Sequence, residues 1–437
     1  MRTVAQQTVR LVTRRLGVFM LVVYLLSSMD RVNVSFAALT MNDDLHFDPG
    51  IYGFGVGLFF VSYMLFQLPG AALIRRFGAA RPLAIMMVAW GFCASLMSCI
   101  NGRFDFYVLR FLLGLAEAGV VPAATFYLAN WVPRQNLGRI MTWAALSLPM
   151  AVIIGAPLSG WLLTQHSIVH SLPGWRWMFF VEGLPTVILG VVAYFRLTES
   201  PAEVRWLTHE QREWLMRELE KDRPKQSLST YSSGQTAGLW TVLSDRNILT
   251  IALAYFCIAM GTYGLLYWLP QVIKAASTGL SPMAVTLVST MPWIAAAAGM
   301  LLNGWHSDRN QERCRHVATG ALIGALGLIL SCAFSSPWLA LLGLVATGFG
   351  QGAAQGLYMA IPIDLLRGNP AAPTAFALIN MIGNCAGLVG ANLIGWLRNA
   401  TGSFSMPIEV LAAVLVVGAL LLVSLPRLTP GRQLAHQ

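Results

Sequence analysis

The chain has 437 residues, of which 56% are hydrophobic and only 11% are charged, and its net charge at pH 7 is +10. Soluble domains carry about 25% charged residues, so this composition excludes an ordinary soluble domain and indicates an all-α membrane protein. The basic residues sit at the ends of apolar runs instead of forming one cluster. This distribution argues against a nucleic-acid partner and for the lipid bilayer as surroundings.

Twelve apolar runs are predicted to cross the bilayer as helices, each of which needs roughly 20 residues. They lie near residues 16–39, 51–74, 82–100, 104–131, 138–164, 175–195, 247–273, 282–305, 316–335, 337–364, 373–397 and 405–425. Six precede and six follow a polar segment. We therefore expect an N-terminal six-helix bundle (1–196), a central loop (197–246) and a C-terminal six-helix bundle (247–437).

Lys and Arg predict the orientation in the membrane, because cytoplasmic loops are enriched in both residues. Most of them fall on the side that also holds both termini and the central loop. The opposite side receives only Arg103, Arg176, Lys274 and Arg398. Both termini are therefore predicted to be cytoplasmic.

The first run contains the charged pair Asp30-Arg31. Arg31 and Asp30 lie about 15 residues, or roughly 22 Å of helix, beyond Arg15, and are therefore deep in the membrane. A charge there costs at least about 2.5–3.5 kcal/mol and usually faces a bundle interior or a watery cavity. The pair either holds helices together as an ion pair or belongs to a site that handles a charged ligand and a proton.

The fourth run places Arg110, Gly114 and Glu117 on one helical face at i, i+4 and i+7. Arg110 is interpreted as part of a structural charge network. For Glu117 we favour function, because desolvation of a membrane-buried carboxyl group lets it bind a proton near neutral pH. Asp30 can do the same, although the charge of Arg31 opposes it.

The central segment predicts a short helix. Thr208 and Gln211 resemble a capping box that opens a helix running to about Lys221. Its apolar face predicts that it lies along the membrane surface. Residues 226–238 are rich in Ser, Thr and Gly and read as a flexible linker. For the whole segment we favour a tether without a specific function.

The second half offers neutral polar groups in its spans. They are Tyr263, Tyr267, Gln351, Gln355, Tyr358, Asn380 and Asn384. Asn380 and Asn384 share a helical face at i and i+4. Each of these groups can hydrogen-bond either a polar ligand or another helix.

Each half has one short basic turn, at the same position in both halves. Arg75-Arg76 follows the second span, and Asp308-Arg309 follows the eighth. Charges at such helix ends can pair with neighbouring helices as conformational latches, or can serve only as topology signals. The six Cys residues match neither a metal site nor a disulfide framework, and no nucleophile–base pair lies in the spans. We therefore expect no enzyme activity, no metal and no cofactor.

Several motifs resemble one family. They are Asp30-Arg31-Val32-Asn33, Arg110-Phe-Leu-Leu-Gly114-Leu-Ala-Glu117, Gly174-Trp-Arg-Trp-Met-Phe-Phe-Val-Glu182, Gly304-Trp-His-Ser-Asp308-Arg309 and Ile379-Asn380-Met-Ile-Gly-Asn384. The whole chain resembles the anion:cation symporter family of the major facilitator superfamily, whose members include sialin and bacterial carriers of galactonate, tartrate and aromatic acids. Tyr267-Trp268-Leu269-Pro270-Gln271 and the central loop are similar to its tartrate, hydroxyphenylacetate and phthalate branch.

The resemblance implies a major facilitator fold and import of a small organic anion with protons across the bacterial inner membrane by a monomeric carrier. By resemblance, Arg31 clamps the substrate carboxylate, Asp30 and Glu117 carry protons, and Tyr63 and Asn380 reach the substrate. One departure is Arg75, which stands where the family has an acidic residue. Exchange of two anions, uncoupled transport and a non-transporting anion sensor stay open as alternatives.

Overall fold

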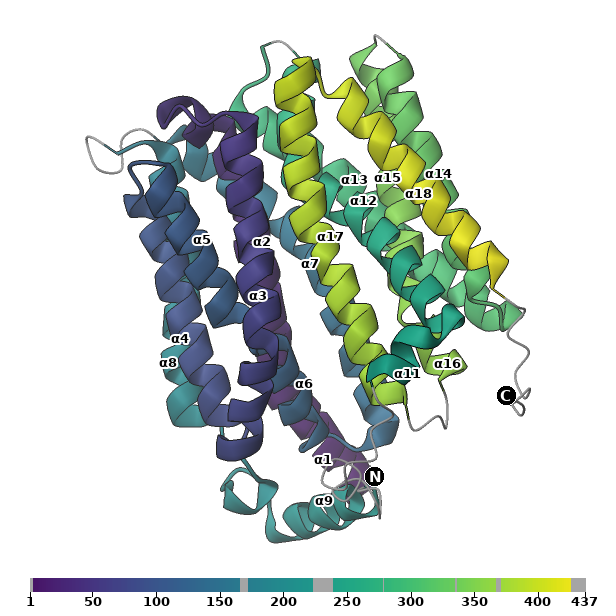
Figure 1. The fold of residues 1–437 in the computed structure, drawn as a ribbon. Helices are drawn as coiled ribbons and strands as arrows, with labels where there is room; N and C mark the ends of the chain where they lie inside the picture. The colour runs from purple at the N-terminus through teal and green to yellow at the C-terminus, as the bar shows by residue number, and fades with distance from the viewer. Residues whose placement is uncertain are drawn as a thin grey trace. The chain divides into compact units, whose positions relative to one another are not determined.

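The computed structural model describes residues 3–165, 172–222, 239–277, 279–334, 336–366 and 371–425. These residues form helices and no strands. The helices are α1 (Val4–Val12), α2 (Val18–Asp44), α3 (Pro49–Phe77), α4 (Ala80–Leu96), α5 (Arg103–Glu117), α6 (Val120–Ala129), α7 (Arg134–Thr164), α8 (Gly174–Arg196), α9 (His209–Asp222), α11 (Leu239–Ser244), α12 (Arg246–Ala276), α13 (Pro282–Asn310), α14 (Cys314–Ala333), α15 (Pro337–Tyr358), α16 (Ala360–Leu365), α17 (Ala372–Thr401) and α18 (Ser405–Ser424) (Figure 1).

The predicted membrane helices are present. Among the described residues, ten helical stretches are long and apolar enough to cross a membrane. α2, with 27 residues, and α15, with 22 residues, are long enough as well. The first helix exceeds its predicted span at both ends. At its start, α1 continues into α2 through a short π-helix at Thr13–Gly17. At its other end, α2 runs on to Asp44. The predicted all-α membrane fold is confirmed.

Two predicted spans are broken by proline. The fourth span divides into α5 and α6 after Glu117, and the tenth divides into α15 and α16 after Tyr358. Proline has no N–H to donate to the carbonyl four residues earlier. Pro122 therefore leaves the carbonyl of Ala118 without its helical donor, and Pro362 does the same for Tyr358. A proline break at the same position in each half of the sequence is consistent with two halves of similar structure.

The described chain groups into two compact units. Unit 1 comprises residues 1–34, 61–155 and 161–232, and unit 2 comprises 35–60, 156–160 and 233–437. The end of α2 and the start of α3 thus belong with unit 2. The division into bundles at 1–196 and 247–437 stays a prediction, and each unit is described by itself below.

Small residues let helices of unit 1 approach closely. α4 and α8 run side by side (Figure 1). A Cβ atom on Gly91 of α4 would lie 2.7 Å from the backbone N of Val187, and one on Gly183 of α8 would lie 2.7 Å from the backbone N of Ser95. Contacts this short leave no room for a side chain. The two helices therefore form a rigid pair.

Unit 2 packs in the same way around α15, which lies against α13 and α14 (Figure 1). A Cβ atom on Gly348 or Gly352 would lie 1.9 Å from the carbonyl oxygen of Pro292 or Ala296, respectively. The neighbouring atoms are backbone and cannot move aside alone. Close helix contact at small residues is the usual way in which membrane helices associate.

We expect Gly352→Ala to destabilise unit 2 by about 1–3 kcal/mol, the usual cost of overpacking. The measurement is the thermal unfolding midpoint of the purified protein in detergent. Gly304→Ala is the matched control, because nothing lies within 4 Å of a Cβ atom there. Equal midpoints for the two variants would contradict the close α13–α15 contact.

Residues 35–60 are held to α12 and α17 by polar contacts within unit 2. Lys274 Nζ donates to Asp43 Oδ2 at 2.9 Å and to the carbonyl oxygen of Leu39 at 2.7 Å. Tyr52 donates to the carbonyl oxygen of Tyr267 at 2.9 Å. These bonds fasten the end of α2 and the start of α3 to helices of the second half of the sequence.

Asp48 caps the start of α3. Its Oδ1 accepts hydrogen bonds from Asn399 Nδ2 at 3.0 Å and from the N–H groups of Gly50 and Ile51 at 2.7 and 2.9 Å. The Asn399 amide, with those two N–H groups, holds the pKa of Asp48 below its ordinary value, although slight burial opposes this. The start of α3 therefore binds Asp48 in its charged carboxylate form.

We expect Asp48→Ala to destabilise the protein by about 1 kcal/mol, the usual cost of losing an N-cap side chain. Because the folded pKa is lowered, the contribution of Asp48 is fully present above about pH 4. It is lost only as the pH falls through the lowered folded pKa. Thermal unfolding at pH 7 and pH 5 should therefore show the same difference between variant and wild type. A difference that vanishes already at pH 5 would contradict the capping role.

Residues 197–222 of the central segment belong to unit 1 and pack within it. The predicted capping box is confirmed, since Thr208 N donates to Gln211 Oε1 at 3.2 Å and Gln211 N donates to Thr208 Oγ1 at 3.3 Å. α9 lies against α1. Trp206 stacks on Trp131 with ring centroids 5.8 Å apart, and the Arg15 guanidinium lies 5.0 Å from the centroid of the Trp206 ring. The apolar side of this segment thus contacts protein, and the predicted linker at 226–238 lies outside the described residues.

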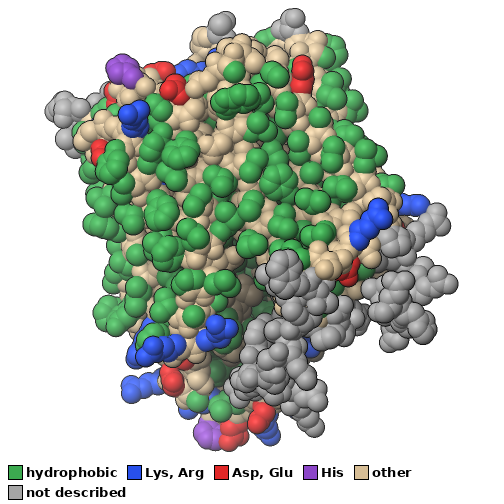
Figure 2. Space-filling model, viewed as in Figure 1, with side chains coloured by type: hydrophobic (Ala, Val, Ile, Leu, Met, Phe, Trp, Pro, Cys, Tyr) green, Lys and Arg blue, Asp and Glu red, His purple; other side chains and the backbone are tan. Residues whose placement is uncertain are grey.

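Hydrophobic side chains cover the exposed middle of the helices, whereas Lys, Arg, Asp and Glu gather at their ends (Figure 2). Leu68, Phe195 and Trp338 are 76 to 78% exposed. An apolar surface of this extent is unfavourable in water and is expected where lipid is the solvent.

Candidate functional site: buried charges in unit 1

Arg31 and Glu117 form an ion pair inside unit 1. Arg31 Nε lies 2.6 Å from Glu117 Oε1, and the Glu117 side chain is fully buried. Ser27 donates to the same oxygen at 2.5 Å. The guanidinium also lies 5.1 Å from the centroid of the Tyr63 ring, which fits a cation–π contact. Three residues predicted from sequence to bind substrate or protons are therefore neighbours.

Glu117 has two carboxyl oxygens in different surroundings. Oε1 accepts both of the hydrogen bonds above, whereas Oε2 is buried and has no hydrogen-bond partner within the described part of the chain. A buried oxygen without a donor is costly while it carries charge. The break between α5 and α6 directly after Glu117 places this carboxyl group at a helix end.

Asp30 has a separate set of polar neighbours in unit 1 and is 2% exposed. Trp90 Nε1 and Thr186 Oγ1 donate to its Oδ2 at 2.7 and 3.3 Å, and Asn33 Nδ2 donates to its Oδ1 at 3.3 Å. All three donors are neutral. Asp30 and Arg31 are neighbours in sequence, but their side chains have different partners.

Two further buried charges belong to unit 1. Arg110 is 1% exposed and lies on α5, as predicted. Glu182 on α8 is 4% exposed. Arg176 donates to the carbonyl oxygen of Ser98 and to the side chain of Asn101.

The residues of unit 2 that were predicted to bind a ligand differ in their burial and in their hydrogen-bond partners. Tyr358 is fully buried, donates to the carbonyl oxygen of Ile251, and stacks on Tyr255 with centroids 4.4 Å apart. Its hydroxyl group would have to leave this carbonyl to donate a hydrogen bond to a ligand. Asn380 Nδ2 donates within its own helix to Phe376 at 3.1 Å, and Asn384 is half-buried on the same helix. The two Asn residues are better placed for a ligand than Tyr358 is.

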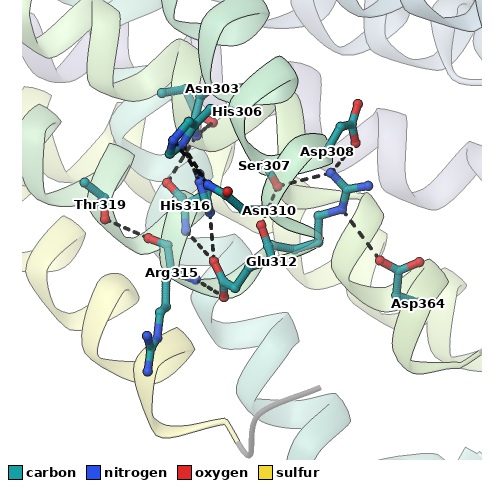
Figure 3. A network of polar contacts seen from close by, with 12 residues as sticks. Asn303, His306, Ser307, Asp308, Asn310, Glu312, Arg315, His316, Thr319 and Asp364 are labelled. Carbon is teal, nitrogen blue, oxygen red and sulfur yellow. Dashed lines mark hydrogen bonds and ion pairs between the residues drawn. The ribbon is translucent and has the colours of Figure 1, made fainter. Parts of the chain in front are cut away.

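The turn between α13 and α14 is tied together by Asp308 (Figure 3). Arg313 NH1 lies 2.5 Å from Asp308 Oδ1 and 3.1 Å from Ser307 Oγ. Arg313 Nε also lies 3.7 Å from Asp364 Oδ2 on α16. The acidic residue of this turn therefore pairs with a neighbouring Arg that also reaches α16, as expected for a residue that holds helix ends together.

A second set of bonds in Figure 3 joins the same two helices. Glu312 Oε2 lies 2.8 Å from His316 Nδ1, and His316 Nε2 lies 2.8 Å from His306 Nδ1. Asn303 donates to the carbonyl oxygens of His316 and Ala353. The turn is thus fixed to α14 and α15 from both sides.

The basic residues of the two turns make few contacts by comparison. The Arg309 guanidinium lies 5.9 Å from the centroid of the Trp305 ring, and that of Arg76 lies 5.2 Å from the ring of the adjacent Phe77. Arg75 and Arg76 are exposed. A latch role for these residues stays a prediction.

The first turn obtains its carboxylate from elsewhere in the chain. Glu199 accepts hydrogen bonds from the N–H groups of Ala79 and Ala80 at 2.9 and 2.7 Å, at the start of α4. Gly78 has a φ of +83°, and a Cβ atom there would lie 2.4 Å from the Glu199 carboxyl carbon. An acidic side chain thus serves this turn although Arg75 stands at the usual acidic position.

Sequence reasoning missed Trp90, Thr186 and Glu199. Trp90 and Thr186 lie in ordinary apolar spans, and nothing local marks them. Within the described residues the six Cys residues are free, and no cluster of metal-binding side chains occurs.

The comparisons with known proteins agree with this architecture. The family model described as Major Facilitator Superfamily matches residues 20–391 and, in a second match, 251–436. An Agrobacterium vitis protein with a provisional name as a tartrate transporter is 37% identical over 97% of this chain and 92% of its own. A quinolone resistance transporter of Acinetobacter baumannii is 35% identical over 95% of this chain and 94% of its own.

Among solved structures, the xylose transporter XylE of Escherichia coli superposes with a TM-score of 0.69 at 16% identity, covering 94% of this chain and 97% of that one. This likeness concerns the fold. The family match spans most of the chain, and its members are transporters and not enzymes. The chain therefore belongs to the Major Facilitator Superfamily, as its motifs predicted, and is a multi-pass membrane transporter.

Proposed function

We propose that the protein imports a small organic carboxylate together with protons across a bacterial inner membrane, with both termini in the cytoplasm. The observation that carries the proposal is the ion pair of Arg31 with the buried Glu117. Arg is always charged and binds carboxylates through a planar fork. A substrate carboxylate and Glu117 therefore compete for the same guanidinium.

This competition supplies the coupling. While Glu117 is charged, it occupies Arg31, and a second anion beside it would be repelled. A proton on the buried Oε2 of Glu117 removes that charge and releases Arg31 to a substrate carboxylate. Release of the proton returns Glu117 to Arg31 and expels the substrate. Binding of the proton and of the anion then favour each other.

Asp30 would hold a second proton. Its partners Trp90, Thr186 and Asn33 are neutral donors. A buried carboxylate with neutral partners keeps an uncompensated charge. We expect Tyr63, Asn380 and Asn384 each to contact the remainder of the substrate, and Tyr358 to support Tyr255. Because one chain supplies all these residues, we expect a monomer to suffice.

The name of the Agrobacterium vitis relative favours tartrate, a small hydroxy dicarboxylate. The name of the Acinetobacter baumannii relative, a quinolone resistance transporter, favours transport of a quinolone as a second candidate. For this candidate we would expect export in exchange for protons. Both candidates use Arg31 and the buried carboxyl groups.

Uptake into proteoliposomes tests the proposal. The panel contains labelled tartrate, a sugar acid, an aromatic acid and a quinolone, each with and without an imposed inward proton gradient. We expect accumulation of one carboxylate class only with the gradient. Uptake that is independent of the gradient but requires an internal counter-anion would indicate exchange of two anions and not symport. Gradient-driven movement of the quinolone alone, in the opposite direction to the protons, would replace import by export.

A further inference from the structure

Four exposed Arg residues lie at one end of unit 1, where α3 passes into α4 and where α8 ends. This arginine cluster consists of Arg75, Arg76, Arg81 and Arg196. One contact brings its members together, because the Glu199 carboxylate accepts hydrogen bonds from the N–H groups of Ala79 and Ala80 at 2.9 and 2.7 Å. Each member is at most four residues from this contact along the chain, which is no more than about 14 Å.

No member of the arginine cluster has an ion-pair partner within the described part of the chain. The Glu199 carboxylate is bound to backbone N–H groups at the start of α4, where the helix dipole favours a negative charge. The α13–α14 turn differs, because Arg313 there pairs with Asp308 and Asp364. With Arg75 at its usual acidic position, the first turn therefore keeps a positive charge that the second turn neutralises.

Exposed apolar side chains begin directly beside the arginine cluster. Ile85 is 59%, Val192 is 42% and Phe195 is 78% exposed. Ile85 shares a face of α4 with Arg81, four residues earlier, and Val192 shares a face of α8 with Arg196, four residues later. Figure 2 shows Lys and Arg side chains at helix ends next to hydrophobic side chains. The surface thus changes from cationic to apolar within about one helical turn, or roughly 5 Å.

An anionic phospholipid has the complementary arrangement, with a negative headgroup joined to apolar chains. Arg stays charged and binds phosphate oxygens through its planar fork. Clusters of four or more basic residues at the end of a membrane helix attract anionic headgroups. The Arg76 guanidinium lies 5.2 Å from the centroid of the exposed Phe77 ring, so a cation and an apolar side chain adjoin here as well.

We propose that the arginine cluster binds the headgroup of an anionic phospholipid, whose acyl chains lie along the exposed apolar faces of α4 and α8. A zwitterionic headgroup has no net charge and would be attracted less strongly. The proposed substrate site does not include these Arg residues. The inference therefore does not depend on the proposed symport.

Native mass spectrometry of the purified full-length protein in detergent tests the inference. Phosphatidylglycerol is the anionic probe, and phosphatidylcholine is the zwitterionic comparison. Wild type should bind phosphatidylglycerol at least about tenfold more tightly, and the double variant Arg75→Gln/Arg76→Gln should lose about ten- to thirtyfold in that affinity. Inorganic phosphate should not displace the lipid, because it lacks acyl chains. Displacement by inorganic phosphate would overturn the assignment to a lipid.

The matched control is the double variant Arg309→Gln/Arg315→Gln, which removes two exposed positive charges at the other turn. It should leave the affinity for phosphatidylglycerol unchanged. Arg75→Lys/Arg76→Lys keeps both charges and should retain most of the binding, since Lys also binds phosphate. Should the Gln double variant of the arginine cluster fail to fold, Arg196→Gln tests the same headgroup from α8, with an expected loss of about fivefold.

Equal affinity of wild type for the two lipids would overturn the inference. An equal loss of affinity in the two Gln double variants would overturn it too, because any two surface charges would then have the same effect. The proposed symport would stand in both cases, since uptake into proteoliposomes tests it separately.

Discussion

Arg31→Lys is expected to abolish most uptake. Lys keeps the positive charge but loses the planar fork that binds a carboxylate through two parallel hydrogen bonds. A hydrogen bond to a charged group contributes about 1.5–3 kcal/mol, so the apparent affinity for the substrate should fall about ten- to hundredfold. The contact of the guanidinium with the Tyr63 ring would change as well. Initial uptake rates over a range of substrate concentrations measure this.

Arg176→Lys is the matched control, because Arg176 donates to Ser98 and Asn101 and has no place in the proposed site. It should transport like wild type when both variants are reconstituted in equal amounts. Near-normal transport by Arg31→Lys would remove Arg31 from the substrate site and would leave the ion pair with Glu117 as a structural contact.

Glu117→Gln is expected to uncouple transport from the proton gradient. Gln can accept the hydrogen bonds of Ser27 and Arg31 at its amide oxygen, but it cannot take up or release a proton. Without a charged Glu117 as competitor, Arg31 should then be available to the substrate carboxylate at every pH. Gradient-driven accumulation should fall to the level of equilibration, whereas exchange of labelled for unlabelled substrate should continue. The two assays on the same proteoliposomes separate coupling from binding.

Glu409→Gln is the matched control, since it removes a carboxyl group that is exposed on α18. It should accumulate substrate like wild type. Full accumulation by Glu117→Gln would show that the proton is carried elsewhere, and would leave Asp30 as the remaining candidate.

The helices follow from local features of the sequence. Apolar runs of membrane length gave all twelve spans, because a helix is the conformation in which a segment in lipid satisfies its own backbone. The capping box at Thr208 and Gln211 was also local and was correct. The breaks after Glu117 and Tyr358 were not expected, although Pro122 and Pro362 could have indicated them.

The site was predictable in part for the same reason. A charged residue in a membrane span is conspicuous on its own, so Asp30, Arg31 and Glu117 could be named without knowing their neighbours. The partners of these three side chains could not be predicted from the sequence. Asp30 and Arg31 adjoin in sequence, yet Arg31 binds Glu117, 86 residues away, because adjacent residues on a helix point in different directions.

The sequence by itself therefore determined that this chain crosses a membrane and which charges lie within it, since both depend on composition over one helix length. Only the tertiary structure decided which groups those charges meet. Trp90 and Thr186 reach Asp30 from 60 and 156 residues away, and glycines bring their helices, α4 and α8, into close contact. Such partners depend on how helices pack, and helix packing depends on side chains of both surfaces together.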